Sequence, residues 1–185
     1  MGEIEDALER AEQEGFTRQP PKTLKGKINF LVRRLRTTRA VAAEIGVTQR
    51  SVERYRTGAR KHPPAAVAAR IDAAVRAHWQ PRVRARRRRQ AATTGGITVE
   101  TRARFGYTAP IGTTDDGRFR RLTVHLPPDY AARLFEAREA GVGERRLRGI
   151  IAEGFREVYF QDGGTRALDL TEVALTDIDY LDVDY

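Results

Sequence analysis

Apolar residues recur every three or four positions through the first 80 residues, and this spacing predicts helices. The first is a short acidic helix that ends near Gly15. A second helix follows Pro21, and a further one begins at Pro64 and is broken at Pro81. The residues that define the buried faces of these three helices are Ile4, Leu8 and Ala11, then Leu24, Ile28, Leu31 and Leu35, then Val67, Ile71, Ala74 and His78.

Residues 38–57 carry the pattern of two short helices that pack across a tight turn. Gly46 lies at the turn, where a left-handed backbone disfavours a side chain, and Thr48 can cap the second helix. The pattern predicts a helix-turn-helix DNA-binding unit, although a small helical hairpin has the same packing needs. The inward residues are Val41, Ala42, Ile45, Val47, Val52 and Tyr55, and the candidate DNA-reading residues are Thr48, Gln49, Arg50, Glu53 and Arg54.

After residue 120 the pattern changes to one strand followed by two helices. This is the order of a ribbon-helix-helix dimer, in which strands from two chains pair and face the major groove. A small α+β packing or dimerisation unit without DNA contact has the same order. A unit of forty residues buries little surface alone, so both interpretations favour self-association, as in a homodimer. The second candidate DNA-binding strand presents Arg121, Thr123 and His125, and the buried helix residues are Leu134, Phe135, Leu147, Ile150, Ile151, Phe155 and Val158.

Two segments carry weaker patterns. Residues 93–117 are rich in hydroxyls and glycines and have few apolar residues, which predicts a flexible or ribbon-like loop with a turn at residues 115–117. Residues 165–185 interleave apolar residues with acids, which fits an edge strand or a disordered acidic tail.

The basic charge of the chain is concentrated in one region. Residues 17–90 hold 21 Lys and Arg against three acidic residues, a local net charge of +18, whereas the whole chain carries +9. Such asymmetry predicts binding to nucleic-acid phosphates that weakens as salt rises. The densest run, residues 82–89, predicts an electrostatic clamp on DNA, although a solvated linker has the same composition. Its arginines are Arg82, Arg84, Arg86, Arg87, Arg88 and Arg89.

Composition disfavours several other classes of protein. The chain has no cysteine and three scattered histidines, so neither a disulfide framework nor a metal site is expected. No apolar run reaches the length of a membrane span, and the acidic N-terminal residues are unlike a secretory signal, so we expect a cytoplasmic, nucleoid-associated protein. No phosphate-binding loop and no hydroxyl beside a histidine is present in the sequence, so we expect no catalytic apparatus or cofactor of its own.

The fold class that these patterns predict is mainly α, with a helix-turn-helix domain, a Thr/Gly-rich loop and a small strand-helix-helix unit. The expected segments are an acidic helix and linker (1–21), the helix-turn-helix domain (22–80), the basic clamp (81–92), the Thr/Gly-rich segment (93–120), the strand-helix-helix domain (121–160) and the acidic tail (161–185).

Several runs of this sequence together resemble one protein family. They are Met1 to Arg10, Pro21 to Gly26, the two helices around Gly46, residues 93–117, Leu122 to Pro128 and Tyr159 to Asp162. In these runs the chain is similar to the telomere-protecting terminal proteins of linear actinobacterial chromosomes and plasmids. The likeness extends over nearly the whole chain, and the runs are more specific than a helix-turn-helix alone.

The resemblance implies a protein that is joined covalently to the 5′ ends of DNA and primes the filling of recessed telomere ends. The hydroxyl of a threonine would replace the missing 3′-OH, and the matching residue here is Thr114, with Thr113 as its neighbour and alternative. The partners implied are telomeric DNA, a telomere-associated recruiting protein and a DNA polymerase, whose divalent metal ions would activate the hydroxyl toward a deoxynucleotide.

Two other functions fit the DNA-binding pattern. A transcription regulator or plasmid replication initiator would bind a duplex site without ever acquiring a covalent nucleotide. A nucleoid protein would bind most sequences alike. Neither function needs residues 93–117, and this segment therefore favours the priming interpretation.

Overall fold

The computed structural model describes residues 2–108 and 117–185. Helices predominate, and the strands form a small three-stranded antiparallel sheet. The chain divides into two units, which we call the helical unit (Phe16–Arg82) and the sheet unit (Met1–Gly15 together with Val83–Tyr185). The expectation of a mainly α protein is therefore confirmed, and the sheet is larger than the single strand that was predicted.

The helical unit contains the four helices that the apolar spacing predicts between residues 22 and 80. They are α2 (Leu24–Leu35), α3 (Thr38–Glu44), α4 (Gln49–Thr57) and α5 (Ala65–His78). Their inward faces meet in one apolar core, made of Ile28, Leu31, Val41, Ala42, Ile45, Val52, Tyr55, Val67, Ile71, Ala74 and Val75.

Threonines define where three of these helices begin. Thr23, Thr37 and Thr48 each stand at the N-cap, and each hydroxyl accepts a hydrogen bond from the backbone N–H three residues later, at 3.0–3.2 Å. These bonds satisfy donors that the first helical turn leaves without an intrahelical partner. The predicted cap at Thr48 is thus confirmed.

The sheet unit is built on strands β1 (Ile97–Thr108), β2 (Arg118–Leu126) and β3 (Glu172–Asp184). Their order is β2-β1-β3, so β1 is the central strand and both of its neighbours run antiparallel to it. Apolar residues alternate with polar ones along each strand, which gives the sheet one buried face. That face carries Ile97, Val99, Ala103, Phe105, Leu122, Val124, Leu126, Val173, Leu175, Leu181 and Val183.

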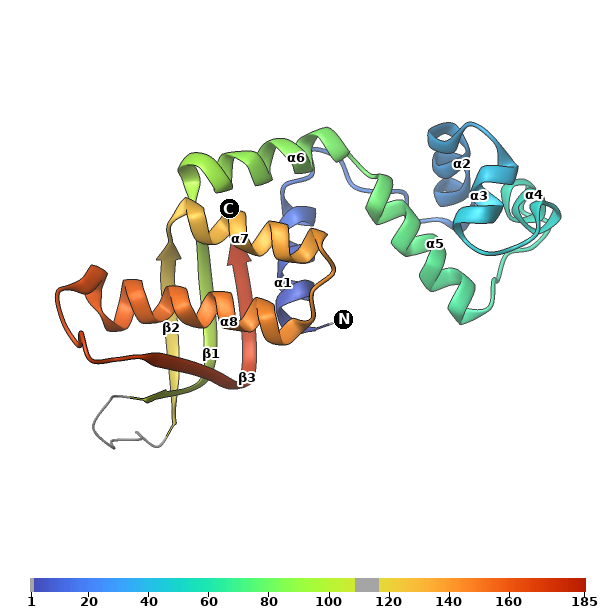
Figure 1. Cartoon of the computed structure of the whole chain (residues 1–185). Helices are drawn as coiled ribbons and strands as arrows, with labels where there is room; N and C mark the ends of the chain where they lie inside the picture. Colours follow the sequence, from blue (N-terminus) through green and yellow to red (C-terminus); the bar gives the residue numbers. More distant parts are fainter. Residues whose placement is uncertain (1, 109–116) are drawn as a thin grey trace. The chain divides into compact units, whose positions relative to one another are not determined.

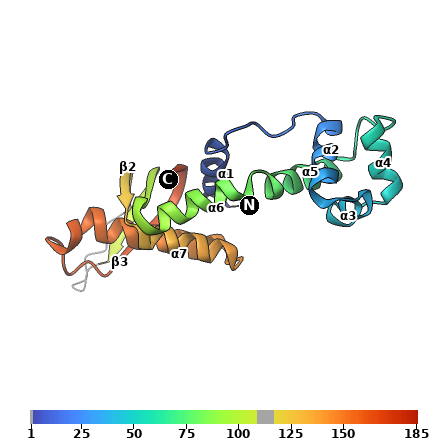
Figure 2. The same cartoon turned by 90° about the horizontal axis from the view of Figure 1, so that it is seen from above.

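Helices cover the buried face of the sheet. Helices α7 (Pro128–Glu139) and α8 (Glu144–Gly154) lie across it, and α1 (Glu3–Glu14) packs beside β3 (Figures 1 and 2). Buried residues of all three join the strands in one core, which includes the buried helix residues predicted for residues 121–160 except Val158, which is partly buried and packs against the core. The remaining elements are α6 (Pro81–Gln90) and three short turns of irregular helix, η1 (Ala91–Gly95), η2 (Phe155–Phe160) and η3 (Asp162–Gly164).

Two predictions for weakly patterned segments change with the structure. The prediction of a flexible or ribbon-like loop over residues 93–117 is corrected for residues 97–108, which form the central strand β1. Every second residue from Ile97 to Phe105 is buried there, and all of these are apolar except Thr101. For the acidic tail, an edge strand and a disordered segment were both open. The edge strand is confirmed, because β3 pairs with β1 along most of its length. The predicted strand-helix-helix order of 121–160 is present as β2, α7 and α8, but β2 pairs with β1 of the same chain.

Among residues 2–108 and 117–185, no helix has the length and apolar character that crossing a bilayer requires. In the same ranges no group of three or more His, Asp or Glu side chains is placed to hold a metal ion.

Candidate nucleic-acid interface

Helices α3 and α4 meet across a short turn in the helical unit. Gly46 adopts φ = +62° at this turn, a conformation that side-chain-bearing residues rarely take. Val52 and Tyr55 hold α4 to the core, since both are almost fully buried. Because these positions face inward, the helical period turns the residues between them toward solvent.

The predicted DNA-reading residues lie on the outer side of α4. Gln49, Arg50, Glu53 and Arg54 are all exposed, as the periodicity requires. The Gln49 side-chain amide donates to the Thr38 hydroxyl at 3.0 Å and to the Glu53 carboxylate at 3.1 Å. Gln49 is therefore held in place before any ligand binds, whereas the two arginines extend from the surface.

Thr48 and Thr38 have roles that the sequence pattern did not separate. The Thr48 hydroxyl is engaged in capping α4 and lies 3.0 Å from the Ser51 hydroxyl, so its main task is structural. Thr38 was not among the predicted reading residues, yet its hydroxyl positions Gln49. No sequence signal links these two residues, because the contact joins different helices.

The helical unit concentrates positive charge. Residues 16–82 hold 16 Lys and Arg against three acidic residues, a net charge of +13. Each acid has a partner within the unit: Asp72 pairs with Lys27 at 2.5 Å, Glu44 with His78 at 3.2 Å, and Glu53 accepts from Gln49. The sheet unit holds 18 bases and 22 acids, net −4. The excess positive charge of the chain thus belongs to the helical unit.

The arginine run of residues 82–89 lies within helix α6, so it is not an extended linker. The helix separates the run into two faces. Arg84, Arg87 and Arg88 are partly buried in the sheet unit, while Arg82, Arg86 and Arg89 are exposed. Arg84, Arg87 and Arg88 are engaged with groups of the sheet unit, so the exposed face of α6 is the part of the predicted clamp that is open to an outside anion.

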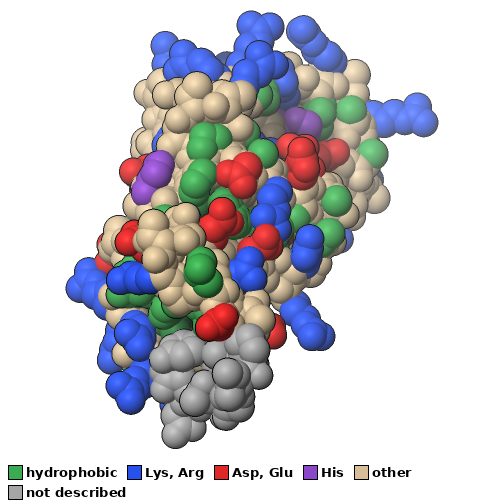
Figure 3. Space-filling view, turned by 60° about the vertical axis from the view of Figure 1, so that its left-hand side comes forward, with side chains coloured by type: hydrophobic (Ala, Val, Ile, Leu, Met, Phe, Trp, Pro, Cys, Tyr) green, Lys and Arg blue, Asp and Glu red, His purple; other side chains and the backbone are tan. Residues whose placement is uncertain are grey.

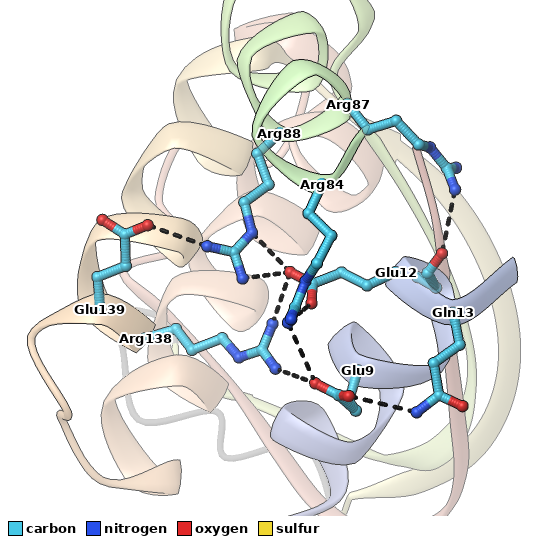
Figure 4. Close-up of polar contacts among 9 residues, drawn as sticks. Glu9, Glu12, Gln13, Arg84, Arg87, Arg88, Arg138 and Glu139 are labelled. Atoms are coloured by element: carbon cyan, nitrogen blue, oxygen red, sulfur yellow. Dashed lines mark hydrogen bonds and ion pairs between the residues drawn. The ribbon is translucent and has the colours of Figure 1, made fainter. Parts of the chain in front are cut away.

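The buried face of α6 is neutralised by acids of the first helix (Figure 4). The Glu12 carboxylate, whose side chain is 1% exposed, contacts the guanidinium groups of Arg84, Arg88 and Arg138. Glu9 pairs with Arg138 at 2.8 Å. Burial lowers the pKa of the Arg88 guanidinium, but the charge and hydrogen bond of Glu12 outweigh it and leave that pKa above its usual value.

The outer face of the sheet carries the second set of predicted contacts. Arg121, Thr123 and His125 are exposed on β2, as the strand alternation predicts. Arg121, however, donates to the Glu100 carboxylate at 2.6 and 3.1 Å, and His125 lies 3.1 Å from the Thr98 hydroxyl. The Arg121 hydrogen bond holds the pKa of Glu100 below its usual value, so the pair is ionised at neutral pH.

Other arginines of this face are paired as well. Arg102 contacts Asp179 at 2.6 Å, and Arg104 contacts Asp177 at 3.2 Å. Figure 3 shows acidic and basic side chains interleaved on the face of the molecule that it presents. Phosphate binding on the sheet would have to displace these carboxylates, so the helical unit is the stronger candidate for DNA contact.

The predicted priming residues Thr113 and Thr114 lie outside the described residues. Their neighbours along the chain are described: β1 ends at Thr108 and β2 begins at Arg118, so the segment joins two adjacent antiparallel strands of the sheet unit.

Comparison of the chain with protein-family models, with curated proteins and with solved structures finds no match. The likeness to terminal proteins therefore rests on the sequence runs quoted above.

Proposed function

We propose that this chain is a DNA-binding terminal protein. The helical unit binds duplex DNA as a helix-turn-helix module, with α4 in the major groove. A threonine hydroxyl between β1 and β2 accepts the first nucleotide from a DNA polymerase. The protein is then a primer and not an enzyme, located at the ends of linear DNA in the nucleoid.

One observation carries the DNA-binding part of the proposal. The exposed side of α4 presents Arg50 and Arg54 from a unit with a net charge of +13, beside a Gln49 amide that is already oriented. Arginines reach phosphates and guanine edges, and glutamine can bond to adenine, so this face supplies both nonspecific and specific contacts.

The priming part rests on the sequence resemblance and on chemical fit. A hydroxyl that attacks the α-phosphate of a deoxynucleotide forms a phosphodiester and releases pyrophosphate, and the polymerase supplies the metal ions for this step. The nucleophile must reach the polymerase site, which a residue buried in a core could not do. Thr114 is the proposed nucleophile and Thr113 its alternative.

A transfer assay tests the proposal. The intact chain, Thr114→Ala and Thr113→Ala are incubated with telomeric template, labelled deoxynucleotide and host extract, then denatured. We expect label on the wild type and on Thr113→Ala, and none on Thr114→Ala. Extract that labels a known terminal protein but not this chain would contradict priming and favour a regulator or replication initiator that binds DNA noncovalently.

A ribbon-helix-helix dimer built from β2, α7 and α8 is a separate proposal. Such a dimer would need β2 to pair with its copy in a second chain, along the strand edge opposite β1. Sedimentation at several concentrations distinguishes a monomer from this dimer, and DNA binding by the helical unit does not depend on the outcome.

A further inference from the structure

The sheet unit contains a pocket of about 350 Å³ on the helix-covered side of β2. Arg120 comes from β2, Tyr159 and Phe160 come from the end of η2, and the remaining wall comes from the loop that leads to β3. The pocket is lined by Arg120, Tyr159, Phe160, Arg166, Ala167 and Leu170, a set that includes two arginines and, among the described residues, no acid.

The two arginines are held in different ways. Arg166 donates from Nη2 to the Tyr159 carbonyl at 2.7 Å and from Nε to the Phe160 carbonyl at 3.2 Å, so its guanidinium is fixed at the end of η2. The Arg120 guanidinium lies 5.9 Å from the centre of the Phe160 ring. Its Nε is buried and has no hydrogen-bond partner among the described residues.

The pocket also offers a surface for a flat ring. Tyr159 is 36% exposed, and its ring stands at 89° to the Phe160 ring with 5.0 Å between ring centres. Leu170 adds an apolar wall. Guanidinium groups attract phosphate and an exposed aromatic ring stacks on a base, so the residue types together match a nucleotide.

The loop that forms the far wall adopts unusual backbone conformations. Asp162 and Ala167 have φ of +50° and +46°, and Gly163 and Gly164 are also in the left-handed region. Non-glycine residues in this region cost free energy and gather at functional sites. The Gln161 carbonyl accepts from the backbone N–H of Gly164, Thr165 and Arg166, which holds the loop in this form.

We propose that this pocket binds a nucleoside phosphate, with the phosphate between Arg120 and Arg166 and the base on the Tyr159 ring. The nucleotide is either free or one unit of a DNA single strand, since both present the same chemistry. The pocket deepens the proposed function, on which its role rests: it would hold a nucleotide or a strand end on the same unit that carries the proposed priming threonine.

Calorimetric titration of the full chain at physiological salt tests this proposal. The probes are dATP, tripolyphosphate, which lacks the base, and pentadeoxyadenylate, which represents a strand. We expect dATP to bind at least tenfold more tightly than tripolyphosphate. Tighter binding of the pentanucleotide than of dATP, with the same response to the variants below, would identify a strand as the ligand, and the reverse order would identify a free nucleotide.

Variants locate the binding. Arg120→Gln and Arg166→Gln should each weaken dATP binding at least tenfold, and Arg145→Gln, at an exposed position of α8, should not change it. Tyr159→Ala keeps both arginines, so it should reduce the affinity for dATP to that for tripolyphosphate while leaving the latter unchanged. This variant separates ligand binding from any disturbance of the loop by loss of Arg166.

Three results would contradict nucleotide binding in this pocket. No heat with millimolar dATP, equal affinity for dATP and tripolyphosphate, or equal weakening by Arg145→Gln would overturn the pocket. Covalent labelling of Thr114 without nucleotide binding would contradict the pocket alone, whereas nucleotide binding without covalent labelling would contradict the priming function alone.

Discussion

Glu12 is a buried carboxylate shared by three arginines. Its side chain is 1% exposed, and its contacts join α1 to α6 and α7 through Arg84, Arg88 and Arg138. A buried charge with partners contributes little net stability, but removal of one side leaves the others without compensation. Here the loss of Glu12 would leave three cations close together, with Glu9 and Glu139 as their remaining acid partners.

We therefore expect Glu12→Gln to destabilise the sheet unit by about 3–5 kcal/mol. Urea unfolding followed by far-ultraviolet circular dichroism should show an earlier transition. The single tryptophan, Trp79, belongs to the helical unit, so its fluorescence transition serves as an internal control and should stay in place. Equal stability of the variant and the wild type would show that the contacts to Glu12 contribute nothing.

Tyr185 lies beside the same cluster, and its phenol should make the stability of the sheet unit depend on pH. Burial, followed by the charge of Glu12, raises the pKa of its phenol to about 12, although neighbouring arginines oppose this. The unfolded chain titrates near 10, so the stability due to the neutral phenol is present below pH 10 and is lost as the pH rises toward 12.

Between pH 9 and pH 12 we expect the free energy of unfolding to fall further for the wild type than for Tyr185→Phe, by about 1–2 kcal/mol. At pH 7 the variant should equal or exceed the wild type, because the Tyr185 hydroxyl is buried without a hydrogen-bond partner among the described residues. Urea midpoints measured across this range check both statements. Parallel pH curves for the two proteins would rule out the raised pKa.

At the scale of elements, α6 shows how a helix divides a uniform arginine run. Residues three and four apart share a face, so Arg84 and Arg88 turn toward the sheet unit while Arg82, Arg86 and Arg89 turn toward solvent. Arg88 and Arg89, which are adjacent in the run, therefore have different surroundings.

Alanine substitutions on the two faces should separate these roles. Arg84→Ala removes a Glu12 partner and should cost the sheet unit about 1–3 kcal/mol, less than the loss of Glu12 because Arg88 and Arg138 remain. Arg86→Ala should change the free energy of unfolding by at most about 0.5 kcal/mol. Thermal unfolding of both variants gives the comparison, and equal losses would mean that the faces do not differ.

The sequence predicted most helices and strand β2 because their apolar residues keep a clear period. Strand β1 also alternates, from Ile97 to Phe105, but its middle inward positions are Thr101 and Ala103, which carry too little apolar surface to stand out. The Thr101 hydroxyl is satisfied by donating to the Tyr180 carbonyl at 2.7 Å, a partner 79 residues away. Contacts of such range leave no local signal.

The same limit applies to the candidate sites. The exposed face of α4 follows from helical period alone and was predictable. The pairing of Arg84 with Glu12 and the gathering of Arg120 with Arg166 depend on how distant segments pack, so composition identified the charges without their partners. For the arginine run, the sequence therefore did not separate the arginines that have partners in the sheet unit from those that are exposed.

At the scale of the whole molecule, the division of charge decides where DNA should bind. The helical unit carries +13 and the sheet unit −4, so the phosphate-dependent part of the affinity belongs to the helical unit. Three arginines of the sheet, Arg102, Arg104 and Arg121, are already engaged with carboxylates.

We expect Arg50→Ala combined with Arg54→Ala to reduce the slope of log affinity against log salt by about 1.8, or about 0.9 for each lost phosphate contact. Fluorescence anisotropy with duplex DNA at several salt concentrations measures this slope. The matched control, Arg102→Ala with Arg104→Ala, removes two arginines from the sheet and should leave the slope unchanged. A larger change in the control would place DNA on the sheet.

The sheet unit takes its first helix from before the helical unit and all its other elements from after it. During synthesis on the ribosome, the helical unit is therefore complete while α1 still lacks every partner it has in the sheet unit. The edge strand β3 is made last, and β1 has only one neighbour until then. The half of the molecule proposed to bind DNA can thus fold early, whereas the half proposed to hold a nucleotide is finished only when β3 joins β1 and α1.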